Sequence, residues 1–195
     1  VPALVSKVVR PKTKREDLPG YGMFIEFCCD ENSTLGTVNA SYGIKHHRLT
    51  KDNFDCLLKH NIDELLSYVK ANPGIDMHGA LPCTAWSIWQ QMAIHRYGEE
   101  YVRKLEARRK ESRKLLCHFL RVANAVIEGG GHVSFEWPRY CTGWALPELR
   151  AFIESNNLHE ALPDGCALGV VDEDGHPHLK PWRFVTTSER LAKAL

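Results

Sequence analysis

Short apolar runs alternate with helix-spaced apolar stripes along this 195-residue chain, and that alternation predicts strands alternating with helices. The runs predict strands at 23–28, 43–49, 75–81, 132–136, 166–171 and 182–186. The stripes predict helices over 53–71, 87–97, 99–128 and 146–156. The stripe within 99–128 is the most regular, and the glycines at 129–131 end it.

This order of elements predicts an α/β fold, a mostly parallel sheet with helices on both faces. A polar turn at 172–175 joins the last two expected strands, which predicts a closing antiparallel hairpin. Residues 1–20 are rich in proline and charge and predict an N-terminal arm, whereas residues 21–195 fit one domain.

Composition places the chain among ordinary globular proteins, with 44% apolar and 25% charged residues. No apolar run approaches the roughly 18 residues of a membrane span, and the start shows no signal-peptide pattern. The seven cysteines include no C-x-x-C pair. They predict reduced thiols in an intracellular compartment, nucleus or cytoplasm, and no structural zinc site. His176 and His178 could pair on a metal, but a loop explains them as well, so no metal is expected.

The formal net charge is only +1, but basic residues gather in two clusters. The first, in the arm, consists of Lys7, Arg10, Lys12, Lys14 and Arg15. The second consists of Lys104, Arg108, Arg109, Lys110, Arg113 and Lys114. Such clusters can meet phosphates, but a solvated helix face gives the same pattern. Both interpretations stay open.

Chemistry-bearing residues fall where the expected strands end, which is where ligands collect in such sheets. Cys83 follows one strand and precedes a helix that Ser87 and Gln90 would cap, and the positive end of a helix stabilises a thiolate. Glu136 ends another strand and could exchange a proton. Arg183 could hold an anion or orient Glu136. The alternative for Cys83 is a small buried apolar residue.

Four segments resemble the catalytic core of cytosine-5 DNA methyltransferases. Residues 82–87, PCTAWS, resemble the family's Pro-Cys-Gln-x-Phe-Ser loop, and 135–138, FEWP, resemble its Phe-Glu-Asn-Val motif. Residues 24–28, FIEFC, are similar to its first, cofactor-binding motif, and 182–185, WRFV, to its Arg-containing strand. The segments follow the family's order within residues 23–186.

The resemblance implies a Rossmann-like methyltransferase fold that uses S-adenosylmethionine to methylate a nucleobase, cytosine C5 in nucleic acid. It implies catalytic roles for Cys83, Glu136 and Arg183. It implies that the cofactor is bound by Phe27, Cys28, Asp30, Ser33, Asp63 and Pro82. It implies substrate contacts from Thr84, Trp86, Ser87 and Trp137. The target base must leave its duplex or be single-stranded for a thiol to reach it.

Departures from the family keep other functions open. The family's cofactor loop carries glycines, whereas residues 28–32 here are CCDEN, and no target-recognition domain follows Arg183. One alternative is a catalytically silent module of this fold that binds nucleic acid or protein. Another is a cysteine hydrolase with His78 or His132 as base.

The expected partner is nucleic acid, DNA rather than RNA, with a separate target-recognition subunit or a surrounding polyprotein, since the chain starts with Val. Five tryptophans surround the proposed site: Trp86, Trp89, Trp137, Trp144 and Trp182. At least half of them are expected to serve packing alone.

Overall fold

A computed structural model describes residues 14–195 and shows a six-stranded mixed sheet in the order β2-β1-β3-β4-β6-β5. The strands are β1 (Met23–Phe27), β2 (Lys45–Leu49), β3 (Asp76–Gly79), β4 (Val133–Pro138), β5 (His159–Ala161) and β6 (Trp182–Thr186). The strands β1, β2, β3 and β4 pair in parallel. The reversed strand β6 lies antiparallel to both of its neighbours, β4 and β5. The expected α/β architecture is therefore confirmed.

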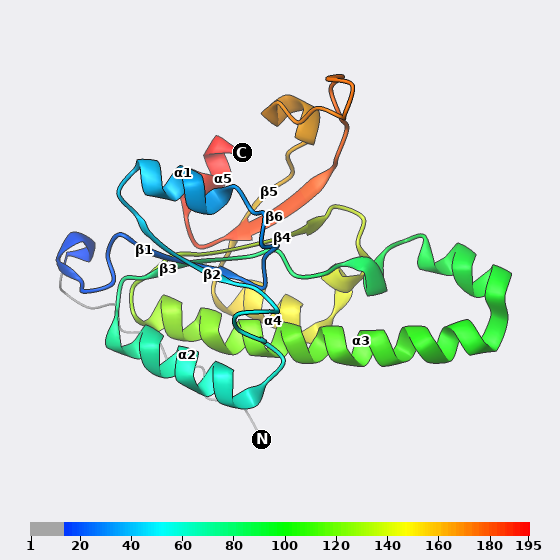
Figure 1. Cartoon of the computed structure of the whole chain (residues 1–195), viewed down its shortest axis with the longest axis horizontal. Coiled ribbons are helices and arrows are strands. Elements are labelled where there is room, and N and C mark those ends of the chain that lie inside the picture. The colour runs from blue at the N-terminus through cyan, green and yellow to red at the C-terminus, as the bar shows by residue number, and fades with distance from the viewer. Residues whose placement is uncertain (1–13) are drawn as a thin grey trace.

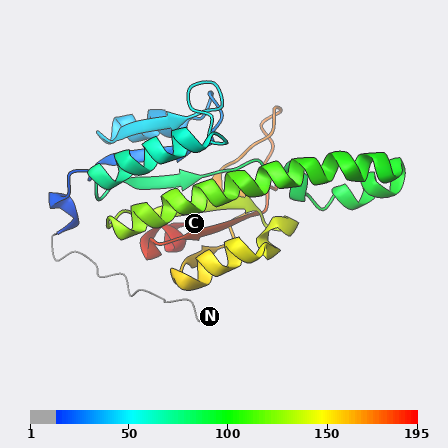
Figure 2. The same cartoon turned by 90° about the horizontal axis from the view of Figure 1, so that it is seen from below.

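Helices cover both faces of the sheet (Figures 1 and 2). Their bounds are α1 (Leu35–Ser41), α2 (Lys59–Ala71), α3 (Gln90–Glu128), α4 (Pro147–Ser155) and α5 (Glu189–Ala194). Helices α2, α3 and α4 lie on one face, and the shorter α1 and α5 lie on the other. None of the helices in residues 14–195 has the length and apolar character needed to cross a membrane.

The strand register divides the sheet into an apolar face and a polar face. Phe27, Gly79 and Phe135 align on the face under α3, where the Phe119 ring packs against Phe27 and Phe135. On the α1 and α5 face, Glu26, His78 and Ser134 align across three parallel strands. The hydrophobic core therefore fills only the thicker layer, and charged groups line the sheet on the other side.

Helix α3 is interrupted at Gly98, whose φ of 64° and ψ of −154° are not helical. Only glycine adopts such a backbone readily. Residues 90–97 form a short helix that folds back against the start of the long one, and together they make an arm extending past the sheet (Figure 1). We call this arm, residues 89–114, the helical hairpin. The expected break at this glycine between two helices is confirmed.

The expected strand at 166–171 is wrong. Residues Gly165–Leu168 form a 3₁₀ helix, which Gly169 ends with a φ of 80°. The partner of β6 is instead β5, a three-residue strand. The antiparallel strand is consequently inserted between two others rather than closing a hairpin at the edge.

The N-terminal basic cluster is only partly described. Lys7, Arg10 and Lys12 lie outside the described residues. Arg15 is committed to the fold, because its guanidinium forms an ion pair with Asp76 and donates to the carbonyl of Gly130 at 3.3 Å. This residue is therefore not available to a phosphate.

Candidate functional site at the carboxyl rim of the sheet

The strand order reverses between β1 and β3, because β2 lies on one side of β1 and β3 on the other. Ligands of open α/β sheets bind at such a switch point, outside the carboxyl ends of the strands. The loops after β1 and β3 meet at this end of the sheet, beside the end of β4. We call this region the rim.

Cys83 lies at the rim, half-buried, directly before the 3₁₀ helix Thr84–Trp86. Burial raises the pKa of its thiol, the ammonium of Lys180 lowers that pKa, and the carboxylate of Glu136 raises it. Both charged groups therefore lie close enough to the sulfur to influence its ionisation. That Cys83 and Glu136 form one catalytic site stays a prediction.

Glu136 is half-buried on β4 and shares the polar face of the sheet with Ser134 and Phe184. Burial raises the pKa of its carboxyl, and Lys180 lowers it. Lys180 belongs to the loop before β6 and lies with its Nζ 4.8 Å from the centre of the Trp182 ring. The sequence analysis did not assign a role to Lys180, which lies two residues before the segment 182–185 that contains Arg183.

Arg183 does not join Cys83 and Glu136. It lies opposite Trp137 in the β4–β6 ladder, so its side chain leaves the sheet on the apolar face. There its Nε donates to Glu160, and its guanidinium lies 4.6 Å from the centre of the Trp144 ring. The expected role in orienting Glu136 is wrong because the two side chains are on opposite faces.

The expected helix cap after Cys83 is also wrong. Helix α3 begins only at Gln90, and the Gln90 side chain donates to the carbonyl of Thr84 at 2.7 Å instead of reaching Ser87. The Ser87 hydroxyl accepts from the backbone N–H of Trp89 at 3.3 Å. A three-residue 3₁₀ turn has little dipole, which accords with a thiol whose pKa is raised.

The residues expected to contact substrate divide into exposed and buried ones. Thr84 is exposed and Ser87 is half-buried, both on the loop that follows Cys83. Trp86 is 8% exposed, and its indole N–H donates to the Ser112 hydroxyl at 2.8 Å. Trp137 is 2% exposed, and its indole N–H donates to the carbonyl of Leu81 at 2.7 Å. Trp137 thus anchors the loop that carries Cys83 and does not face a ligand.

Three of the five tryptophans are buried, namely Trp86, Trp137 and Trp144. The expectation that at least half serve packing is confirmed. Trp89 is the exception that matters below, because 67% of its surface is exposed.

In the loop after β1, few of the expected cofactor ligands are free to bind. Phe27 is fully buried against Phe119 on the apolar face, so only its backbone can meet a ligand. The Ser33 hydroxyl donates to Glu26. Asp30 is exposed and accepts from the N–H of Asn32 at 2.8 Å. Cys28 has a φ of 56°, a left-handed conformation that is costly for a residue with a side chain.

A charged cluster on the polar face of the sheet holds this loop. Arg48 donates to the carbonyl of Glu31 at 2.7 Å and to the carbonyl of Ser33. His46 Nε2 lies 3.0 Å from the Glu26 carboxylate. Arg48 Nε, 3.9 Å from that carboxylate, is the one buried side-chain polar atom without a hydrogen-bond partner in residues 14–195. The Arg48 guanidinium therefore holds the loop backbone through hydrogen bonds to two of its carbonyls.

Asp63 does not lie at the rim. It is on the outer surface of α2, where hydrogen bonds from Lys59 and then Arg121 lower the pKa of its carboxyl. Asp55, in the loop after β2, is the better candidate for a cofactor contact. It is half-buried and lies close enough to Cys28 to raise the pKa of that thiol. One oxygen of Asp55 accepts from the N–H of Leu57 at 2.8 Å. The available signal was an acidic residue soon after the second strand.

The carboxylates near the rim fit a cationic nucleoside. S-adenosylmethionine carries a sulfonium, an ammonium and ribose hydroxyls, and carboxylates can interact with all three. The exposed Asp30 and Glu31 and the half-buried Asp55 follow the first two strands of the sheet, and the exposed Pro82 follows the third. No family model, curated protein or solved structure matches the chain.

Neither histidine proposed as a hydrolase base pairs with Cys83. His78 Nδ1 lies 2.8 Å from the Ser134 hydroxyl, and its ring stacks on Phe184. Burial lowers the pKa of His78 to about 4. His132 precedes β4 at the opposite end of the strand from the rim, with its Nδ1 3.2 Å from Thr187 Oγ1. The geometry offers no cysteine–histidine dyad among residues 14–195.

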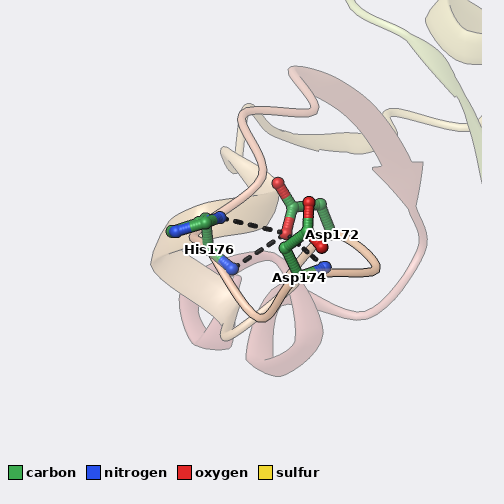
Figure 3. A group of neighbouring side chains, drawn as sticks. All are labelled: Asp172, Asp174 and His176. Atoms are coloured by element: carbon green, nitrogen blue, oxygen red, sulfur yellow. Dashed lines mark hydrogen bonds and ion pairs between the residues drawn. The ribbon is translucent and has the colours of Figure 1, made fainter.

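Three exposed residues in the 172–176 turn bring their ligand atoms within 4.8 Å of one another (Figure 3). They are Asp172, Asp174 and His176. Asp172 Oδ1 accepts from the backbone N–H groups of Asp174 at 3.0 Å and His176 at 2.9 Å. That carboxylate therefore has a structural task in closing the turn. His178 is not part of the group.

Proposed function

We propose that the protein is an S-adenosylmethionine-dependent methyltransferase that acts on a nucleobase, cytosine C5 in nucleic acid, through Cys83. The observation that supports this most strongly is that Cys83 follows β3 and Glu136 lies on the neighbouring parallel strand β4, toward the same edge of the sheet, with Lys180 lowering the pKa of both groups. The mixed sheet with its reversed β6 is compatible with the Rossmann-like methyltransferase fold that the resemblance implies.

In this proposal Cys83 attacks C6 of the cytosine ring as a thiolate, which makes C5 nucleophilic. Burial favours the protonated form of Glu136, so its carboxyl can donate to N3 while its second oxygen accepts from the exocyclic amine. Lys180 lowers the pKa of both groups and so increases the thiolate fraction. In the proposal, Cys83 is the nucleophile, Glu136 donates to the ring nitrogen, and Lys180 lowers the pKa of both groups.

S-adenosylmethionine supplies the electrophilic methyl group when bound. Asp30 and Glu31 would face its cationic part, and Asp55 its ribose hydroxyls. The left-handed Cys28 and the hydrogen bond from Arg48 to the carbonyl of Glu31 fix the backbone of the loop after β1, so the loop is ordered before the cofactor binds.

The proposed partner is nucleic acid, with DNA preferred to RNA, and either a second subunit or a surrounding polyprotein supplies target recognition. All seven cysteines are free thiols, which supports the proposal of a reducing compartment, nucleus or cytoplasm.

The second candidate is a catalytically silent module of the same fold that binds nucleic acid or protein. It is favoured by the raised pKa of Cys83 and by the absence of an α-helix N-terminus at the thiol. The two candidates differ in whether a covalent bond to the base forms.

An oligonucleotide containing 5-fluorocytosine tests the proposal, because fluorine at C5 blocks the proton loss that would release the enzyme. With S-adenosylmethionine present, we expect a covalent adduct that a denaturing gel and mass spectrometry detect. Cys83→Ser should abolish the adduct, and Glu136→Gln should slow its formation. Cys141→Ser is the matched control, because Cys141 is a buried thiol near Cys83, which contributes to the raised pKa of Cys141. An adduct that persists in Cys83→Ser, or none in the native protein, would refute the proposal.

A further inference from the structure

The helical hairpin, residues 89–114, exposes apolar and aromatic side chains that nothing in the fold covers. Trp89 is 67% exposed, Met92 65% and Tyr97 59%. Trp89, Met92 and Arg96 are spaced by three and four residues, so they share one side of the short helix. Large exposed apolar groups gathered on one helix mark an interaction surface.

The same hairpin is strongly basic although the chain is nearly neutral. It carries eight Lys and Arg against four Glu, a formal charge of +4 within a chain of +1. Three of the basic residues are engaged: Lys104 pairs with Glu100, Arg109 with Glu106 and Arg113 with Glu148. Five have no ion-pair partner anywhere in the described part of the chain, namely Arg96, Arg103, Arg108, Lys110 and Lys114. Arg96 lies with its guanidinium 5.4 Å from the centre of the Tyr97 ring.

The hairpin is joined to the rim by the loop that carries Cys83. The indole N–H of Trp86 donates to the Ser112 hydroxyl at 2.8 Å, and Arg109 donates to the carbonyl of Ala85 at 3.3 Å, so the loop and the long helix of the hairpin are held together. A cavity of about 200 Å³ lies between this loop and α3. Its lining includes Pro82 and Thr84 from the loop and Arg108 from the helix.

We infer that the helical hairpin binds a single nucleic-acid strand and leads it to Cys83, with bases stacked on Trp89 and Tyr97 and phosphates on the unpaired basic residues. Flat exposed rings interleaved with cations are what single-strand binding requires, because every base has a face to stack and every phosphate is negative. The choice of nucleic acid over an acidic protein rests on the proposed function.

The test is fluorescence anisotropy with a labelled, cytosine-containing single-stranded DNA 20-mer, without cofactor and in the Cys83→Ser background. Base stacking on a protein ring contributes about 1–3 kcal/mol per base, so Trp89→Ala and Tyr97→Ala should each raise Kd by roughly five-fold or more. The matched control is Tyr42→Ala, because Tyr42 is 79% exposed but lies after α1. Far-UV circular dichroism should show unchanged helicity in all three.

Charge is tested by Arg103→Gln combined with Arg108→Gln, with the exposed Lys70→Gln on α2 as control. Removal of two phosphate contacts should reduce the slope of log Kd against log salt by about 1.4. An unchanged Kd in the ring variants, or an equal loss in Tyr42→Ala, would overturn the inference. So would a concentration-dependent dimer that the ring variants abolish while DNA binding persists. This binding assay requires no covalent adduct, so strand binding by the hairpin can be found even if no adduct forms with 5-fluorocytosine. An adduct can likewise form even if the hairpin variants bind DNA normally.

Discussion

Trp137→Phe should destabilise the protein and loosen the loop that carries Cys83. The native indole N–H donates to the carbonyl of Leu81 at 2.7 Å, and the ring is 2% exposed between Phe135 and Trp144. Phenylalanine keeps an aromatic ring but leaves that buried carbonyl without its donor, which costs about 1–3 kcal/mol. The lost ring volume adds about 1 kcal/mol through the cavity it leaves. We therefore expect a total loss of about 2–4 kcal/mol in the free energy of unfolding.

Urea denaturation followed by circular dichroism measures this loss. Trp89→Phe is the matched control, since its ring is 67% exposed, and we expect a change within about 0.5 kcal/mol. Iodoacetamide labelling, quantified for the Cys83 peptide by mass spectrometry, should be faster in Trp137→Phe than in the native protein. A loss under about 0.5 kcal/mol with native labelling would show that the indole does not anchor the loop.

Three further changes follow from the structure. The pKa of His78 is lowered to about 4, so its contribution to stability is fully present above its ordinary pKa of 6.5 and is lost as pH falls through 4. His78→Gln should therefore reduce the change in unfolding free energy between pH 7 and pH 4, measured by urea titration, by up to about 3 kcal/mol. An unaltered pH dependence of stability would contradict this. Lys180→Met should shift the iodoacetamide labelling of Cys83 to higher pH, since Lys180 lowers the pKa of that thiol, whereas Lys45→Met should not; coincident profiles would remove Lys180 from the site. The Cβ added by Gly98→Ala meets no atom within 4 Å, but alanine is forced to a φ of 64°. The free energy of unfolding should therefore fall by about 1–3 kcal/mol, seen as a lower melting temperature. An unchanged melting temperature would mean that the hairpin backbone relaxes without cost.

The sequence predicted most elements because their apolar patterns are long or regular. The runs at β1 to β4 and β6 form strands where the patterns indicated, and the stripe of 99–128 is the buried side of α3. It missed β5, because His159–Ala161 is short and largely exposed. It placed the start of α2 six residues too early, since Phe54 and Leu57 pack on the core from a turn and not from a helix.

Site residues were harder to predict where register or loop path decides. Strand spacing could not reveal which face Arg183 would take, because one residue of register reverses every side chain. The family resemblance pointed to Asp63, whereas in the structure Asp55, in the loop after β2, is the carboxylate that raises the pKa of Cys28. Lys180 lies in a loop whose path no local pattern fixes. Cys83 and Glu136 could be singled out because the sequence places each near the carboxyl end of a strand, β3 or β4.

The most direct test of the central claim is a calorimetric titration with S-adenosylhomocysteine, the product form of the cofactor. We expect saturable binding with a Kd in the micromolar range, about −8 kcal/mol. Asp55→Asn should weaken it at least about ten-fold, and Asp63→Asn should leave it unchanged, because Asp63 faces away from the rim. No heat at millimolar ligand, or equal loss in both variants, would contradict a cofactor site between β1 and β3.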